Sequence, residues 1–133
     1  MKQKLKLALV GAGERGQYCY APYAKMHGYE IEFVAVADPH KARREKFVQD
    51  YHVPAEGVFE TAEQFFARPR MADAVLICTQ DSQHYAYACQ AIDLGYSILL
   101  EKPISPSVRE CLDLQRRAEE KGTQIMVCHV MRY

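Results

Sequence analysis

Three glycines near the start of the chain have the spacing that brings a peptide backbone close to a phosphate. Gly11, Gly13 and Gly16 form the pattern G-x-G-x-x-G after an apolar segment and before a segment with helical character. The first glycine permits a tight turn, the second lets the backbone approach a pyrophosphate, and the third lets a helix pack closely on a strand. Free N–H groups in the first helical turn, which includes Glu14 and Arg15, would attract the anion. The pattern predicts a dinucleotide-binding loop, with a ligand-free glycine turn as the alternative.

A carboxylate follows the second apolar segment at the distance expected for a ribose-binding acid. Asp38 comes about 20 residues after Gly16, the separation at which such an acid accepts hydrogen bonds from the adenosine ribose. It also precedes Pro39, which is typical of a helix N-cap, and the two roles can coexist. Because a carboxylate repels a 2′-phosphate and Pro39 has no N–H to bind one, we expect NAD as the cofactor in preference to NADP. Arg43 and Arg44 could counter this repulsion, although we interpret both as solvated helix residues.

Two opposite charges follow residues 97–100, a predicted buried strand, where an inert turn would be ordinary. Glu101 and Lys102 stand directly before Pro103. A lysine at such a place can hold a substrate hydroxyl or carbonyl oxygen and stabilise the charge that develops there during hydride transfer. The proline restricts Lys102 to extended conformations and so helps to aim it. Lys102 is therefore the candidate catalytic residue, and an exposed lysine at a strand end is the alternative.

Six apolar segments alternate with helical patterns and must position these residues. The segments are 5–11, 31–37, 57–60, 73–79, 97–101 and 123–130, of which the third is the weakest. Such alternation predicts an α/β protein with a doubly wound Rossmann fold, a parallel sheet in the order 3-2-1-4-5-6 and helices on both faces. Ligands bind outside the carboxyl ends of such strands, so residues 79–84, residues 101–103 and Arg132 are expected to converge.

Capping residues predict where several helices begin and end. Ser82 is a candidate N-cap, and Gly95 lies just beyond the end of the apolar stripe that follows it. Ser105 followed by Pro106 predicts the start of a later helix, and Gly122 its end.

The helical segment after the glycine loop contains a proline and several tyrosines. Pro22 removes one internal hydrogen bond, so it should kink or shorten this helix while leaving its first turn untouched. Tyr18, Tyr20 and Tyr23 have no accompanying basic residues, so we interpret them as packing residues and not as a platform for nucleic-acid bases.

The composition is that of a single domain, residues 1–133, with 49% hydrophobic residues. Seventeen basic and 17 acidic residues give no net charge, which disfavours nucleic acid as a partner.

The five cysteines lack C-x-x-C spacing, which favours a reducing, cytoplasmic setting, and no metal-ligand constellation is present. We expect Cys78, Cys89 and Cys111 to be small core residues. No apolar run approaches the ~20 residues of a membrane span, so a soluble protein is expected.

The motifs VGAGERG, Asp38, TQDSQH, EKPIS and VCHVMRY, in this order and at these separations, resemble the amino-terminal domain of the Gfo/Idh/MocA oxidoreductases. This is the family of glucose-fructose oxidoreductase and inositol dehydrogenase, and the resemblance covers essentially the whole chain. It implies a dehydrogenase that moves hydride between a nicotinamide cofactor and a sugar, cyclitol or related polyol. It also implies a longer protein whose carboxyl-terminal domain supplies most substrate contacts and commonly builds a homo-oligomer. The 133 residues alone should then show negligible turnover.

The resemblance also implies roles for individual residues. Lys102 matches the catalytic lysine of the family, Glu101 its neighbour near the nicotinamide, and His84 the histidine that closes the motif after the fourth strand. That motif usually reads close to T-P-N-x-x-H, and here it begins with Thr79 and Gln80.

Three residues of these motifs have roles that the resemblance does not fix. Asp81 stands where the family has asparagine, and it cannot donate a hydrogen bond when ionised. The alternative interpretation of His84 is that it is only a polar residue in the first turn of a helix. Arg132 fits the arginine-aromatic ending that follows the sixth strand, near the nicotinamide.

Two other classes of protein compete with the dehydrogenase. One is a non-catalytic, dinucleotide-responsive regulatory module, which the presence of Lys102 disfavours. The other is a Rossmann-like methyltransferase, which usually carries an acidic residue just before its glycines, and the segment LALVG has none.

Overall fold

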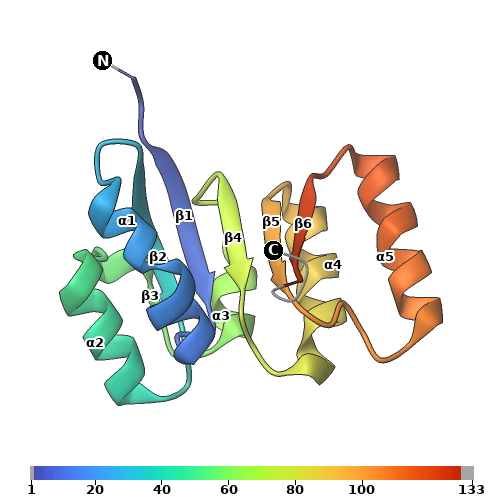
Figure 1. Cartoon of the computed structure of the whole chain (residues 1–133), viewed down its shortest axis with the longest axis horizontal. Coiled ribbons are helices and arrows are strands. Elements are labelled where there is room, and N and C mark those ends of the chain that lie inside the picture. Colours follow the sequence, from blue (N-terminus) through green and yellow to red (C-terminus); the bar gives the residue numbers. More distant parts are fainter. Residues whose placement is uncertain (1, 130–133) are drawn as a thin grey trace.

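The chain folds around a six-stranded sheet in the order β3-β2-β1-β4-β5-β6 (Figure 1). The computed structural model describes residues 2–129. The strands are β1 (Leu5–Val10), β2 (Ile31–Ala37), β3 (Val58–Phe59), β4 (Ala74–Ile77), β5 (Ser97–Glu101) and β6 (Ile125–Cys128). Every neighbouring pair is parallel. The predicted doubly wound fold and strand order are confirmed, and the weakest predicted strand is also the shortest.

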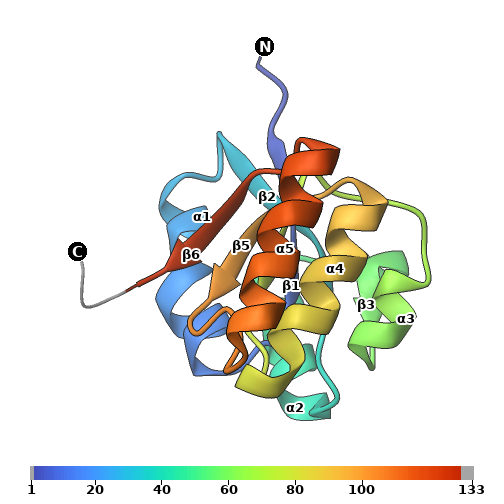
Figure 2. The same ribbon diagram turned by 90° about the vertical axis from the view of Figure 1, so that its right-hand side faces the viewer.

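Helices cover the sheet in two layers. They are η1 (Glu14–Tyr20, a π-helix), α1 (Pro22–Met26), α2 (Lys41–Tyr51), η2 (Ala55–Gly57, 3₁₀), α3 (Ala62–Phe66), η3 (Asp81–Gln83, 3₁₀), α4 (His84–Leu94) and α5 (Val108–Lys121). One apolar cluster joins α3, α4 and α5 to one face, and a second joins α1 and α2 to the other. Figure 2 shows α4 and α5 side by side over the sheet.

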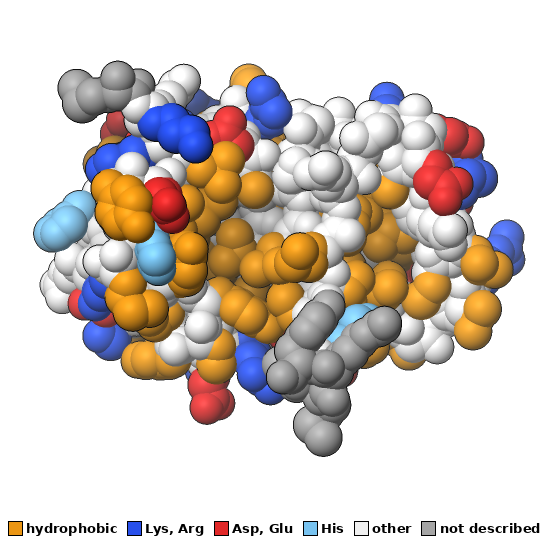
Figure 3. Space-filling view, turned by 45° about the horizontal axis from the view of Figure 1, so that its top comes forward, with side chains coloured by type: hydrophobic (Ala, Val, Ile, Leu, Met, Phe, Trp, Pro, Cys, Tyr) orange, Lys and Arg blue, Asp and Glu red, His pale blue; other side chains and the backbone are white. Residues whose placement is uncertain are grey.

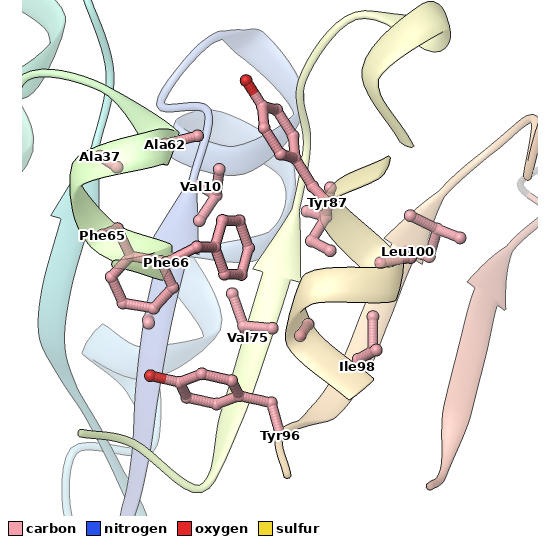
Figure 4. Close-up of a cluster of buried hydrophobic side chains, with 14 of the residues drawn as sticks. Val10, Ala37, Ala62, Phe65, Phe66, Val75, Tyr87, Tyr96, Ile98 and Leu100 are labelled. Atoms are coloured by element: carbon pink, nitrogen blue, oxygen red, sulfur yellow. The ribbon is translucent and has the colours of Figure 1, made fainter. Parts of the chain in front are cut away.

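The core lies on both faces of the central strands because neighbouring strand residues point to opposite sides. Val10 and Val75 pack with Phe65 in the cluster under α3 and α4 (Figure 4). Leu9 belongs to the opposite cluster and packs with Phe47 of α2. All five side chains are almost completely buried. This burial holds β1 and β4 in the middle of the sheet, where the strand order reverses.

Part of the surface is apolar, and Figure 3 shows such side chains gathered across one face of the molecule. Leu5, Tyr29 and Met126 are among the large apolar side chains that remain exposed. Within residues 2–129, no helix has both the length and the apolar character needed to cross a bilayer.

The helix before β5 ends as predicted but begins differently. Gly95 follows α4 in the left-handed conformation, with φ of 85°, and its N–H bonds to carbonyls of the last turn. Ser82 is not the N-cap, because it lies inside the 3₁₀ turn η3. Gln80 and Gln83 cap that turn through reciprocal side-chain bonds, and α4 starts directly after it.

The last helix also begins later than predicted. Ser107, and not Ser105, is the N-cap of α5, because its Oγ accepts a hydrogen bond from the Glu110 N–H at 3.3 Å. Ser105 Oγ instead accepts from the Ser107 N–H at 3.0 Å and donates to the Glu110 carboxylate. Pro106 therefore precedes the cap. Gly122 ends α5 with φ of 65°, as predicted.

The predicted interruption at Pro22 is confirmed. The helical segment divides into η1 and α1, and Pro22 is the first residue of α1. The change extends upstream of the proline, because Ala21 N–H bonds to the Gly16 carbonyl, five residues earlier, at 3.0 Å. The turn after the glycine loop is therefore wider than an α-helix.

Candidate dinucleotide-binding site

The glycine loop connects β1 to η1 at the carboxyl edge of the sheet. Gly11 has φ of 92°, and a Cβ added there would lie 2.5 Å from the Cys78 carbonyl oxygen. A Cβ on Gly16 would lie 2.4 Å from the Gly11 carbonyl oxygen. The nearest atom to a Cβ on Gly13 would be Nη1 of Arg43, at 3.8 Å. Two glycines are thus required by close packing, while the backbone at Gly13 is open to a ligand.

Asp38 ties the end of β2 to the glycine loop. Its Oδ2 accepts a hydrogen bond from the Ala12 N–H at 2.8 Å, and its Oδ1 accepts from the His40 N–H at 2.7 Å. The residue is buried, with 5% exposure. Asp38 is not the N-cap of α2, because the helix begins at Lys41 and His40 is the N-cap residue. The carboxylate instead closes a turn with the N–H two residues on.

A cavity of about 520 Å³ lies between the glycine loop and α2. Its lining residues are Ala12, Gly13, Glu14, Gln17, Tyr18, Ala42, Arg43 and Lys46. Lys46 forms an ion pair with Asp50 at 2.8 Å, whereas Arg43 is exposed beside the loop. The cavity therefore places open backbone beside the guanidinium of Arg43, which suits an anionic ligand, and Glu14 is the one acidic residue of the lining.

Arg44 differs from the solvated residue that the sequence indicated. Its Nη1 donates to the carbonyl oxygen of Asp38 at 2.7 Å, and its Nη2 lies 3.8 Å from Oε1 of Glu60. Only 11% of the side chain is exposed. This arginine supports the backbone at the end of β2, so Arg43 is the cation that faces the loop.

His84 joins the loops that follow β4 and β5. The residue has 0% exposure, with Nδ1 lying 2.6 Å from the Pro103 carbonyl oxygen and Nε2 lying 3.1 Å from the Thr79 carbonyl oxygen. Both partners are acceptors, so a neutral imidazole satisfies one of them and a protonated imidazole both. The ring acts on the site by holding the backbone on either side, and it presents no free nitrogen to a ligand.

The other residues of the motif after β4 divide between the site and helix capping. Thr79 Oγ1 is buried and has no hydrogen-bond partner within the described chain, so it is available to a ligand. The Gln80 side chain is used in capping η3. Asp81 is the first, exposed residue of that turn.

Glu101, the last residue of β5, has a buried carboxylate with two different environments. Its Oε2 accepts a hydrogen bond from the hydroxyl of Tyr20, while its Oε1 lies 3.9 Å from Nε of Arg15. Burial, followed by hydrogen bonding to Cys128 and Glu101, raises the pKa of Tyr20 above its ordinary value. This role of Tyr20 differs from the packing role that its sequence position indicated. The signal in the sequence was its place on the helix that follows the glycine loop, where a partly buried phenol needs a polar partner.

Lys102 is exposed at the start of the loop after β5. Within residues 2–129 its ammonium has no ion pair or side-chain hydrogen bond, so the charge is free to meet a ligand. In the chain, Lys102 lies between two residues that are held by hydrogen bonds, Glu101 through its carboxylate and Pro103 through its carbonyl. The predicted Arg132 lies outside the described residues.

The cysteines remain thiols, and none of the five forms a disulfide. Burial raises the pKa of Cys78 and Cys89 above the ordinary thiol value. Burial also raises the pKa of Cys128, although hydrogen bonding from Tyr20 opposes this. These shifts disfavour thiolate chemistry. Among the described residues, no three His, Cys, Asp or Glu side chains are grouped as metal ligands.

A reversal of strand order beside a glycine loop is the arrangement that defines a dinucleotide-binding Rossmann domain. The model of the GFO_IDH_MocA group, described as an oxidoreductase family with an NAD-binding Rossmann fold, matches residues 5–129. The chain therefore belongs to the Gfo/Idh/MocA family, which confirms the resemblance seen in its motifs.

Individual proteins agree with this assignment. The chain is 25% identical over 130 residues to scyllo-inositol 2-dehydrogenase (NADP(+)) IolW of Bacillus subtilis, covering 97% of the chain and 34% of that relative. It is 28% identical over 132 residues to scyllo-inositol 2-dehydrogenase (NAD(+)) of the same organism, covering 98% and 36%. The WlbA dehydrogenase of Bordetella pertussis, solved with NADH and UDP-GlcNAcA, has the same fold, with a TM-score of 0.83 and 20% identity. That match covers 96% of this chain and 36% of WlbA. The chain thus spans about a third of the length of these relatives.

Proposed function

We propose that the chain is the cofactor-binding part of a dehydrogenase that transfers hydride between a nicotinamide dinucleotide and a carbon of a sugar, cyclitol or related polyol. The observation that carries the proposal is the exposed ammonium of Lys102, held at the sheet edge that also bears the glycine loop. The inositol dehydrogenases among the relatives support a polyol as the substrate class. The dehydrogenases named above give no support to the alternative of a non-catalytic module, and membership of the family excludes the methyltransferase.

The residues present fit a dinucleotide. The backbone around Gly13 would bind the diphosphate, because nothing fills the space where a side chain would stand. Asp38 would accept hydrogen bonds from the adenosine ribose at the end of β2. Thr79 Oγ1 and Glu101 Oε1, both buried without partners among residues 2–129, would meet donors near the nicotinamide. When bound, the cofactor supplies or receives the hydride.

Lys102 would perform the polar part of the reaction. Its ammonium would hold the oxygen on the reacting carbon and stabilise the negative charge that develops there. It could also pass a proton to or from that oxygen. Glu101 and His84 would fix the backbone from which this lysine extends, because the Glu101 carboxylate binds the Tyr20 hydroxyl and the His84 ring contacts the Pro103 carbonyl.

We also propose that NAD is preferred over NADP. The buried carboxylate of Asp38 would repel a 2′-phosphate, and Arg44 is already engaged with the Asp38 carbonyl and with Glu60. Arg43 remains as the nearby cation that could bind such a phosphate. The relatives include both an NADP-dependent and an NAD-dependent enzyme, so the measurement must be made on this chain.

Residues 1–133 would form the amino-terminal domain of a longer, homo-oligomeric protein whose remaining part supplies most substrate contacts. The coverage of only 34–36% of the length of the inositol dehydrogenases supports this proposal. Reading the coding sequence downstream of Tyr133 tests it, and a stop codon in the native gene at that point would contradict it.

The role of Lys102 is tested by Lys102→Ala in the intact protein with a panel of polyols. We expect kcat to fall by a factor of about 100 or more, because the charge on the reacting oxygen loses its partner. The dissociation constant of NADH should stay nearly unchanged. Lys121→Ala, at the far end of α5, is the matched control and should keep full activity. An undiminished kcat in the first variant would remove Lys102 from the mechanism.

A further inference from the structure

Tyr20 links the helix after the glycine loop to the end of β5. Its hydroxyl donates to Oε2 of Glu101, a residue 81 positions later in the chain. A tyrosine is protonated at neutral pH, and burial with its hydrogen-bond partners raises the pKa of Tyr20 further, so the hydroxyl acts as the donor. One oxygen of the carboxylate is therefore held by a group from a distant part of the sequence.

The second oxygen of the same carboxylate lacks a donor. Glu101 is 6% exposed, and Oε1 is buried without a hydrogen-bond partner within residues 2–129. Arg15 Nε, at 3.9 Å, is too distant for a hydrogen bond, and its side chain is 44% exposed. Buried polar atoms are normally hydrogen-bonded, because a missing partner leaves the cost of desolvation uncompensated. A ligand that donates to Oε1 would remove this cost.

The unsatisfied oxygen lies next to the candidate catalytic lysine. Glu101 ends β5 and Lys102 follows it directly. Glu101 is buried whereas Lys102 is exposed, so the carboxylate is turned into the protein and the lysine side chain toward solvent. Both side chains extend from neighbouring residues at the carboxyl edge of the sheet, which is the edge where a ligand of this fold binds.

We infer that Tyr20 is a positioning residue: it holds the Glu101 carboxylate so that Oε1 accepts a hydrogen bond from a hydroxyl of the ligand bound beside Lys102. This inference rests on the proposed function, since nicotinamide dinucleotides and polyols both carry hydroxyl groups. The hydroxyl belongs either to the ribose next to the nicotinamide or to the substrate, and the two sources give different results below.

The single hydrogen bond distinguishes this arrangement from ordinary core packing. A phenylalanine would fill nearly the same volume as Tyr20, so packing alone does not require the hydroxyl. A purely structural buried carboxylate would also have donors on both oxygens. Here the protein supplies one donor and leaves the other oxygen free, which is the condition for recognising a ligand.

The test compares Tyr20→Phe with the unaltered chain and with a matched control. Tyr23→Phe is the control, because Tyr23 lies on the adjoining helix α1, is half exposed and stacks on His27 through a ring that phenylalanine retains. Circular dichroism melting of all three proteins monitors folding. Calorimetric titrations with NADH, ADP-ribose and ADP then measure binding, since ADP lacks the second ribose and ADP-ribose lacks only the nicotinamide.

Each source of the hydroxyl predicts a distinct pattern. If the ribose next to the nicotinamide is the donor, Tyr20→Phe weakens NADH and ADP-ribose about tenfold and leaves ADP unchanged. If the substrate is the donor, all three affinities stay the same. The intact protein then shows a KM for its polyol raised about tenfold, with kcat changed less. Tyr23→Phe matches the unaltered protein in every measurement.

The second measurement tests whether Tyr20 acts through Glu101, by combining substitutions of the two residues. If Tyr20 acts through the carboxylate, Tyr20→Phe combined with Glu101→Gln should lose no more affinity or KM than Glu101→Gln alone. Additive losses would overturn the inference, as would equal weakening of NADH, ADP-ribose and ADP, or no change in any affinity, KM or kcat. If the unaltered chain fails to bind NADH, the proposed function falls with the inference. If it binds NADH and Tyr20→Phe has no effect, the inference alone falls.

Discussion

At the scale of single residues, the site depends on polar side chains that bind the backbone. Asp38 accepts from the N–H groups of Ala12 and His40, and His84 contacts the carbonyls of Thr79 and Pro103. These contacts place loops from different strands relative to one another. Lys102, whose ammonium is unpaired within residues 2–129, extends from one of these loops.

Replacing Asp38 should change cofactor choice and also lower stability. Asp38→Asn removes the negative charge, so the repulsion of a 2′-phosphate is lost, but its single acceptor oxygen can serve only one of the N–H groups of Ala12 and His40. We expect the ratio of the NADPH to the NADH dissociation constant to fall about tenfold, consistent with removal of one unfavourable charge contact. Titrations of both cofactors at a fixed salt concentration measure it. Arg43→Ala should shift the ratio in the opposite direction, and an unchanged ratio in both variants would contradict this assignment of specificity.

At the scale of elements, the sequence predicted the order of strands better than the ends of helices. All six strands were located, because buried strands are apolar runs that the sequence displays directly. The N-caps assigned to Ser82 and Ser105 were wrong. Ser82 lies inside the 3₁₀ turn η3, and the nearby Ser107 takes the N-cap position predicted for Ser105. Capping depends on hydrogen bonds between residues a few positions apart, and several serines can offer the same oxygen.

A substitution of Gly16 tests how tightly the glycine loop and η1 pack. Gly16→Ala would put a methyl group 2.4 Å from the Gly11 carbonyl oxygen, and this backbone atom cannot rotate away. We expect a loss of about 1–3 kcal/mol in the free energy of unfolding, measured by urea denaturation. Gly13→Ala is the matched variant, because the nearest atom to its methyl group is 3.8 Å away. It should keep its stability and lose NADH affinity, and equal stability of the two variants would disprove the packing role.

At the scale of the whole molecule, stability at high pH depends in part on a contact between helices. Tyr87 of α4 donates to Oε1 of Glu63 of α3 at 2.7 Å, and burial, followed by this bond, raises the pKa of Tyr87 to about 12. An unfolded tyrosine loses its proton near pH 10. Between about pH 10 and 12 the folded protein holds a proton that the unfolded chain has released, so the free energy of unfolding falls as pH rises.

Tyr87→Phe should make this alkaline decline shallower. Urea denaturation from pH 8 to pH 12 measures the slope in both proteins. Tyr29→Phe is the control, because Tyr29 is 69% exposed and should leave the slope as it is. An identical slope in all three proteins would show that Tyr87 does not contribute to the decline.

The sequence by itself determined the Rossmann fold, the strand order, the glycine loop and the place of Lys102. These features follow from apolar periodicity, from the sterics of glycine and from the rule that ligands bind at the carboxyl ends of parallel strands. Only the tertiary structure decided that Tyr20 holds Glu101 and that Arg44 is buried against the Asp38 carbonyl. The bond of Tyr20 joins residues 81 positions apart. Whether a polar side chain meets such a partner depends on how the helices pack on the sheet, which no local pattern records.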